Sequence, residues 1–243
     1  MKKLIALGLI ALWAFPALGA DLPTKAPPAP VVAAVPLYNW TGFYVGAHGG
    51  YAGGNVTVTD INGGVNPGPF NYKPNGGIVG GQAGYNYQLG SFVVGIEGDI
   101  GYMALNGKGI IGSANAAAHQ DLTLGSGLYG DVTGRVGYAV DRFLVYGKGG
   151  YAFFDGSAKQ TTTNPGYVTT GTGTFNGWTA GGGVEYALTP NITIKAEYLH
   201  YDFGSQGGYQ TNVGDKSSPI GYQFKNNTSL TFDTVKAGVN YRF

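Results

Sequence analysis

Ten charged residues lie in segments of the chain where large apolar side chains occupy every second position. All ten fall on the alternate positions, so in a β-strand they would share the face opposite the apolar residues. Equal numbers of acids and bases suit an enclosed interior, because an unpaired charge is costly in a low dielectric. We therefore expect a charged network in the lumen of a β-barrel. Its members are Glu97, Asp99, Asp131, Glu185 and Glu197 with Arg135, Lys148, Lys195, Lys236 and Arg242.

Four of these residues occupy equivalent positions along their segments. Glu97, Arg135, Lys148 and Glu197 are each the sixth residue counted from a predicted short turn. Strand tilt and stagger shift such levels, so the layer is approximate. An eight-stranded barrel has room for little beyond its own side chains. We expect the network to plug the barrel, with a narrow gated channel as the alternative.

The geometry of one turn places a specific pair within this network. If residues 189–191 form a three-residue hairpin loop, Leu188 lies opposite Ile192. In that register Glu185 lies directly across from Lys195, with Cβ atoms ~5 Å apart. Both side chains would face the lumen, and we expect them to form an ion pair. Losing one partner of an enclosed pair costs roughly 3–5 kcal/mol, because the other charge is stranded.

Other kinds of chemistry have little support in the sequence. His48, His119 and His200 lie in different segments with no pair at ligand spacing, so we expect no metal site and no cofactor. Spacing brings no serine, histidine and acid to one level, so we do not expect an enzyme. The chain has no cysteine, which excludes a lipoprotein and a disulfide framework.

The last segment of the chain shows the strand pattern most plainly. From Val235 to Phe243 every second residue is apolar or aromatic, with polar residues or glycine between them. A soluble sandwich hides its apolar face, whereas a transmembrane barrel turns that face toward lipid. A final strand of this kind with a C-terminal aromatic resembles the recognition strand of bacterial outer-membrane barrels. Phe243 and Tyr241 are therefore the candidate assembly signal.

The same alternation recurs in eight segments that form four hairpins. Short turns at 90–91, 141–142 and 189–191 alternate with long loops at about 53–75, 105–120, 155–173 and 204–227. This arrangement is typical of an outer-membrane barrel with short periplasmic turns and long external loops. We predict an all-β fold over residues 38–243, an eight-stranded antiparallel up-and-down transmembrane β-barrel.

The parity of each segment assigns its outward residues. Tyr87, Tyr138 and Tyr186, together with Tyr241, each close an even-numbered segment and would form an aromatic girdle at the periplasmic end. In the fourth segment Leu122 and Leu124 are expected to face outward. A soluble lipocalin-like barrel would show the reverse pattern, with polar residues outside and an apolar cavity inside.

The N-terminus has the three regions of a secretory signal. Two lysines precede an apolar run at residues 4–15 and a small-residue segment at 17–20, so residues 1–20 are the predicted signal peptide. The run is shorter than the ~20 residues that a spanning helix needs. Residues 21–37 contain five prolines and are expected to form an extended periplasmic leader. Removing the two lysines leaves 12 basic against 13 acidic residues, which gives no sign of a nucleic-acid partner.

Several segments resemble the outer-membrane immunogenic protein family of alpha-proteobacteria, which is similar to opacity-type surface antigens and carries a porin-family label. They are residues 39–46 (NWTGFYVG), 177–179 (GWT), 183–191 (GVEYALTPN), 195–198 (KAEY) and 201–204 (YDFG). The resemblance covers the chain after the signal, is specific in the strands and is not specific in the loops. Leu199 stands where the family often has arginine, so we expect the lumen network to be one charge short.

The resemblance implies an abundant surface protein of a Gram-negative outer membrane that supports envelope integrity. We expect a structural barrel with a plugged lumen; the alternative is a narrow small-solute porin or a haemin-binding or host-contact protein, as attributed to some members. The implied partners are outer-membrane lipid and lipopolysaccharide, the barrel-assembly machinery and periplasmic chaperones.

Overall fold

The computed structural model describes residues 38–60, 70–111, 120–162, 168–213 and 222–243. The chain divides into Met1–Pro36 and Leu37–Phe243, and the predicted signal peptide and leader lie outside the described residues. The second unit is built from β-strands, and none of the described residues forms a helix long and apolar enough to cross a membrane.

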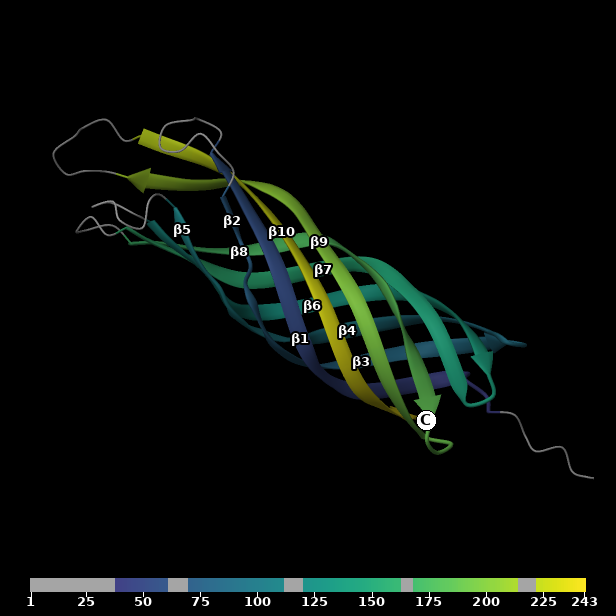
Figure 1. Cartoon of the computed structure of the whole chain (residues 1–243). Coiled ribbons are helices and arrows are strands. Elements are labelled where there is room, and N and C mark those ends of the chain that lie inside the picture. The colour runs from purple at the N-terminus through teal and green to yellow at the C-terminus, as the bar shows by residue number, and fades with distance from the viewer. Residues whose placement is uncertain (1–37, 61–69, 112–119, 163–167, 214–221) are drawn as a thin grey trace, which may run out of the picture. The chain divides into compact units, whose positions relative to one another are not determined.

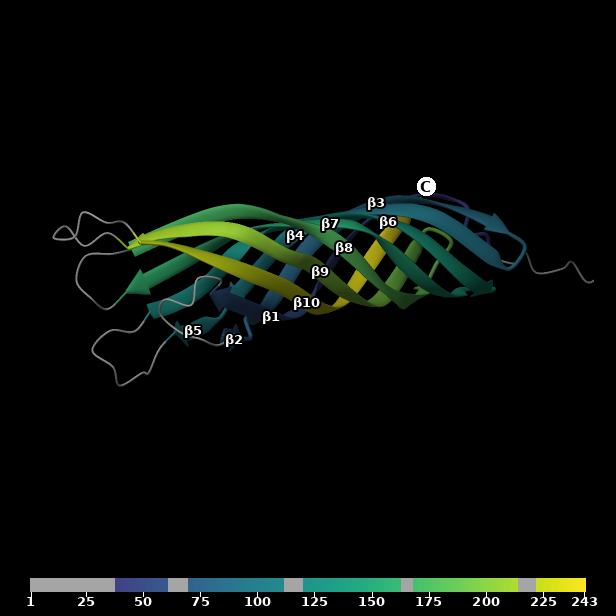
Figure 2. The ribbon, with the colours of Figure 1, turned by 90° about the horizontal axis from the view of Figure 1, so that it is seen from above.

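Eight long strands form one closed antiparallel sheet (Figures 1 and 2). Each long strand pairs with the next long strand along the chain, and β10 pairs with β1 to close the sheet. The predicted barrel is therefore confirmed. Two short strands, β2 and β5, pair with β1 and β6. The bounds are β1 Gly42–Asp60, β2 Phe70–Tyr72, β3 Asn75–Leu89, β4 Phe92–Asn106, β5 Lys108–Ile111, β6 Gln120–Val140, β7 Phe143–Thr162, β8 Val168–Ala187, β9 Ile192–Val213 and β10 Tyr222–Arg242.

The three short turns lie at the predicted positions and fix the register of their hairpins. Leu89 pairs with Phe92 across residues 90–91, and Val140 pairs with Phe143 across residues 141–142. Asp141, in the turn at residues 141–142, has a φ of 50°. This is the left-handed region, which aspartate tolerates better than most residues.

The long loops are much shorter than the sequence predicted. β1 continues to Asp60 and β7 to Thr162, while β8 begins at Val168 and β10 at Tyr222. Alternation of apolar and polar residues is needed only where one face of a strand meets lipid. Beyond that zone the strands are held by backbone pairing and by buried apolar side chains, so segments rich in glycine, threonine and asparagine extend the barrel without outward apolar residues.

The outer wall carries a continuous band of exposed apolar side chains on all eight long strands, for example Phe43 at 65% and Val136 at 61% exposure. Tyr87, Tyr138, Tyr186 and Tyr241 border the band at the end with the short turns, as predicted. A second set of exposed aromatics lies further along the strands, at Tyr51, Tyr102, Tyr151, Trp178 and Tyr198. An apolar band between two aromatic girdles is the mark of a barrel that spans a membrane.

The interior is not polar throughout. Beyond the charged residues, toward the end opposite the short turns, a buried apolar cluster includes Phe154, Phe203 and Phe232, and the rings of Phe154 and Phe232 are 5.4 Å apart. Leu124 belongs to this cluster at 3% exposure, so its predicted outward position was wrong. A register shift between Leu124 and Gly127 in the β6–β7 pairing reverses the side-chain parity there. Leu122 lies outside the residues whose side chains are described.

Candidate functional site in the barrel interior

The structure places all ten predicted charged residues inside the barrel, with exposures of 5% or less. They come from β4, β6, β7, β8, β9 and β10, where the pleat points them inward. Eight of them are joined by ion pairs, four acids with four bases. These eight, which we call the central network, are Glu97, Asp99, Glu185 and Glu197 with Arg135, Lys148, Lys195 and Lys236.

Lys148 joins opposite walls of the barrel. Its Nζ lies 2.6 Å from Glu97 Oε1 and 3.0 Å from Asp99 Oδ2, both on β4, and 3.2 Å from Glu197 Oε1 on β9. β7 is hydrogen-bonded to β6 and β8 and to neither of the strands that supply these carboxylates. The side chain therefore reaches across the lumen instead of along the wall.

Two further lysines approach the same carboxylates. Lys195 Nζ is 3.0 Å from Glu97 Oε1, and Lys236 Nζ is 3.3 Å from Asp99 Oδ1 and 3.2 Å from Glu197 Oε1. Glu97, Asp99 and Glu197 lie close enough together to offer three oxygens to one metal ion. Three ammonium groups already occupy the space around these oxygens, and their positive charge opposes a metal cation. The residues do not fit a metal centre.

Arg135 and Glu185 form a second part of the central network. Its Nη2 donates to Glu185 Oε2 at 2.9 Å and its Nη1 donates to the Tyr44 hydroxyl at 3.0 Å. The guanidinium carbon lies 3.9 Å from the centroid of the Tyr146 ring, a cation–π distance. Glu185 also accepts hydrogen bonds from the Thr193 hydroxyl and from Asn240 Nδ2.

The expected ion pair between Glu185 and Lys195 is absent, although both residues are described. The predicted register is present, with Glu185 directly opposite Lys195. The carboxylate instead binds Arg135, Thr193 and Asn240, while the ammonium binds Glu97 and Glu197. The register fixes only the positions of the two Cβ atoms. In a narrow lumen, long side chains can reach partners on the opposite wall.

Two of the ten residues lie outside the central network. Arg242 has no ion pair among the described residues; its Nη2 donates to the carbonyl oxygens of Asn39 at 2.8 Å and Thr41 at 3.0 Å. Asp131 lies opposite Asp99 in the β4–β6 register, and its Oδ2 accepts a 2.8 Å hydrogen bond from Tyr201. Asp131 Oδ1 has no hydrogen-bond partner within the described part of the chain.

Neutral side chains complete the site; alternation assigns them to the inner face, but the predicted network contained charged residues only. The Tyr44 hydroxyl donates to Glu97 at 2.7 Å and the Tyr146 hydroxyl donates to Glu197 at 2.8 Å. His48 Nδ1 is 2.6 Å from Gln82 Oε1, and its Nε2 is 2.5 Å from the Tyr129 hydroxyl. All five residues have the parity of the charged residues, which predicts their inward position but not their hydrogen-bond partners.

The histidines do not form a common site in the part of the chain that is described. His48 is buried in the interior, whereas His200 lies on the outer face with Nδ1 2.8 Å from Asp233 Oδ1. His119 is outside the described residues.

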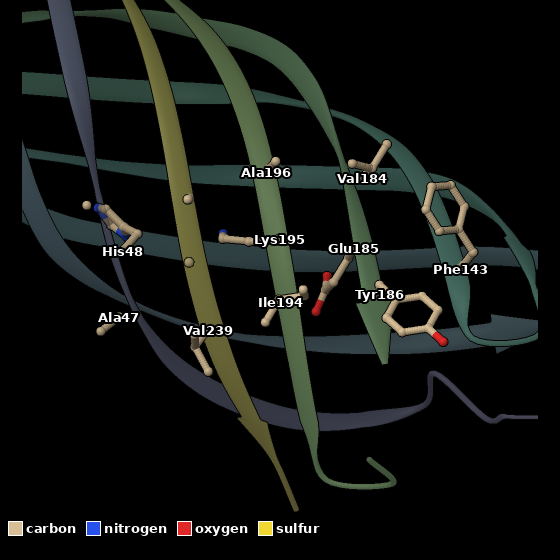
Figure 3. A pocket seen from close by; sticks show the side chains of 13 residues that line it. Ala47, His48, Phe143, Val184, Glu185, Tyr186, Ile194, Lys195, Ala196 and Val239 are labelled. Carbon is tan, nitrogen blue, oxygen red and sulfur yellow. The ribbon is translucent and has the colours of Figure 1, made fainter. Parts of the chain in front are cut away.

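A hollow of about 540 Å³ lies over β1, β8, β9 and β10 (Figure 3). Its apolar lining consists of outward-facing residues, the small Ala47, Ala196 and Ala237 beside larger ones such as Val239 and Ile194. Glu185, Lys195 and His48 also border it, but their side chains are buried in the interior. The hollow is therefore an apolar depression on the outer wall and does not extend the charged site to the surface.

Comparison with known proteins identifies relatives along almost the whole chain. The family model described as outer membrane protein beta-barrel domain matches residues 28–243. The 31 kDa outer-membrane immunogenic protein of Brucella melitensis is 35% identical over 277 residues, covering 100% of both chains. The 22 kDa outer membrane protein of Rhizobium leguminosarum is 31% identical, covering 86% of this chain and 80% of that protein. In fold, the chain is similar to OprG from Pseudomonas aeruginosa, with a TM-score of 0.55, 12% identity, and coverage of 86% of this chain and 99% of that one.

Proposed function

Because this chain belongs to the outer membrane protein beta-barrel family, we propose that it is a structural barrel whose interior side chains plug the lumen. The protein lies in the outer membrane of a Gram-negative bacterium, as its relatives do. A structural role means that the barrel contributes a rigid, membrane-spanning element to the envelope and catalyses no reaction.

The observation that carries this proposal is the position of Lys148. Its ammonium group is held by carboxylates of β4 and β9, so opposite walls are joined through the middle of the lumen. A solute would have to break several buried ion pairs at once, and each stranded charge is costly. The apolar cluster around Phe154 and Phe232 adds a second barrier beyond the charges. Such an interior favours a plug over an open pore.

The external parts of the strands support a role at the cell surface. Beyond the second aromatic girdle, β7, β9 and β10 continue for many residues as paired strands with an apolar core of their own. The relatives from Brucella are named immunogenic proteins. We extend this to the present chain as a surface-exposed antigen, with its external strands as the accessible part.

Single-channel recording in planar bilayers tests the plug. We expect the refolded barrel to produce no steady conductance, and the double variant Glu97→Ala with Lys148→Ala to produce one, because it removes side chains from the middle of the lumen. Tyr87→Phe, which alters only an outward residue, is the matched control and should remain silent. Stable unitary conductance of the unaltered protein would contradict the plug and support the narrow-porin alternative.

A further inference from the structure

Residues 38–41, immediately before β1, cross the end of the barrel that carries the short turns. Trp40 is completely buried there. Its neighbours are interior side chains of other strands, among them Val93 of β4, Leu144 of β7 and Ala187 of β8. A side chain from the edge of the first strand therefore fills the periplasmic mouth and packs against the opposite wall.

Polar contacts tie this segment to all three short turns. The Trp40 backbone N–H donates to Gln88 Oε1 at 2.7 Å, and Gln88 Nε2 donates to the carbonyl of Gly90 in the first turn. Trp40 Nε1 donates to the Asp141 carbonyl at 3.1 Å, and the Tyr38 N–H donates to Asp141 Oδ1 at 3.1 Å. The Tyr38 hydroxyl donates to the carbonyl of Pro190 at 3.3 Å.

Arg242 links the same segment to the last strand. Besides its hydrogen bonds to the carbonyls of Asn39 and Thr41, its guanidinium carbon lies 4.9 Å from the Tyr38 ring centroid and 5.7 Å from that of Trp40. In the β1–β10 register Arg242 is opposite Tyr44. One side chain thus belongs both to the seam that closes the barrel and to the segment that fills its mouth.

We propose that residues 38–41 form a cap that locks the barrel after the seam between β1 and β10 has closed. The cap needs three finished turns and a paired β10 as its binding surface, so it can form only on a complete barrel. Once formed, it opposes reopening of the seam, because separating β10 from β1 would pull Arg242 away from the cap and expose Trp40. The interior charge of Arg242 thus serves this lock and not the central network.

The cap can be observed through the fluorescence of Trp40. In the chain without residues 1–20, Trp178→Phe leaves Trp40 as the single tryptophan. Two readouts are measured on the barrel refolded in lipid vesicles: quenching of Trp40 by acrylamide in the folded state, and the rate of unfolding in concentrated urea. The test variant is Arg242→Gln. The control is Arg142→Gln, which alters an exposed arginine at a turn without contacting the cap.

We expect Arg242→Gln to make Trp40 accessible to acrylamide and to speed unfolding by roughly tenfold or more, because charge-assisted hydrogen bonds and a cation–π contact are lost together. The control should change neither readout. Tyr38→Ala, which alters a residue outside the strands, should shift both readouts in the same direction and is available if Arg242→Gln does not fold.

Three results would overturn the proposal. If Trp40 stays shielded while unfolding accelerates, Arg242 acts only within the strand. If Trp40 becomes exposed without faster unfolding, the cap exists but locks nothing. If neither readout changes in Arg242→Gln and Tyr38→Ala, these contacts do not hold the cap.

Discussion

Each lysine of the central network contacts more than one carboxylate, so the loss of one lysine removes several ion pairs and leaves the interior with an excess of negative charge. Lys148 contacts Glu97, Asp99 and Glu197, whereas each of these carboxylates retains at least one other ammonium group within 4 Å. The contribution of a residue here to the free energy of unfolding depends on how many ion pairs it forms and not on its charge alone.

Lys148→Met should destabilise the barrel by roughly 3–5 kcal/mol, because it removes three buried ion pairs and leaves four acids with three bases in the central network. Adding Glu97→Gln should recover part of that loss by restoring equal numbers of acids and bases. Urea unfolding in lipid vesicles measures both effects. Arg142→Met, an exposed arginine at a turn, should change the free energy of unfolding by no more than about 0.5 kcal/mol. Strictly additive losses in the double variant would show that Lys148 and Glu97 do not interact.

Asp131 should respond differently from the other interior acids. It has no ion pair among the described residues, and an unpaired buried charge is unfavourable. Asp131→Asn keeps the shape and an acceptor for the Tyr201 hydroxyl, so we expect stability to stay the same or rise. Glu97→Gln, its matched comparison, should lower stability by several kcal/mol, roughly as for any broken buried pair. Equal losses in the two variants, measured by the same urea titration, would show that Asp131 has a partner.

At the scale of the strands, alternation predicted which residues face inward but could not predict their partners. Parity placed Glu185 and Lys195 on one face and in the right register, yet each binds side chains from other strands. Alternation also failed to predict the parts of the strands that lie beyond the membrane. There neither face of a strand meets lipid, so the sequence pattern indicated neither the extended strands nor the inward position of Leu124.

In the terminal strand, the contribution of Phe243 to stability can be measured separately from its contribution to assembly. Phe243 is 74% exposed on the outer wall, and its ring centroid lies 5.3 Å from that of Tyr241. Its backbone N–H donates to the Phe43 carbonyl at 3.1 Å. Deleting Phe243 removes one hydrogen bond and an outward ring, so the refolded barrel should lose only about 1 kcal/mol.

In cells we expect the same deletion to slow or abolish insertion while secretion across the inner membrane continues. The reason is that assembly machinery reads a C-terminal aromatic in the proteins this chain resembles. Pulse labelling followed by isolation of the outer membrane measures the rate, and Phe243→Tyr, which keeps an aromatic, serves as the control. Normal yield and rate of the truncated chain would remove the role assigned to Phe243.

At the scale of the whole molecule, the outer wall of the barrel is apolar and much of its interior is polar. Apolar side chains cover the outer wall between the girdles, while buried charges and hydrogen bonds fill much of the interior. This inversion is stable only if lipid surrounds the wall, so the cost of an outward charge should depend on its depth in the membrane.

Ile96 and Val140 provide a matched pair of outward positions for this dependence. Ile96, 56% exposed, lies on β4 between Phe92 at the periplasmic girdle and Tyr102 at the external one, whereas Val140, 64% exposed, adjoins the turn at Asp141. Ile96→Arg should cost about 2–4 kcal/mol and Val140→Arg only about 0–1 kcal/mol, because the second arginine can reach the interface. Urea unfolding in lipid vesicles compares the two variants with the unaltered barrel. Equal costs at both positions would show that the band between the girdles does not lie in the hydrocarbon of the membrane.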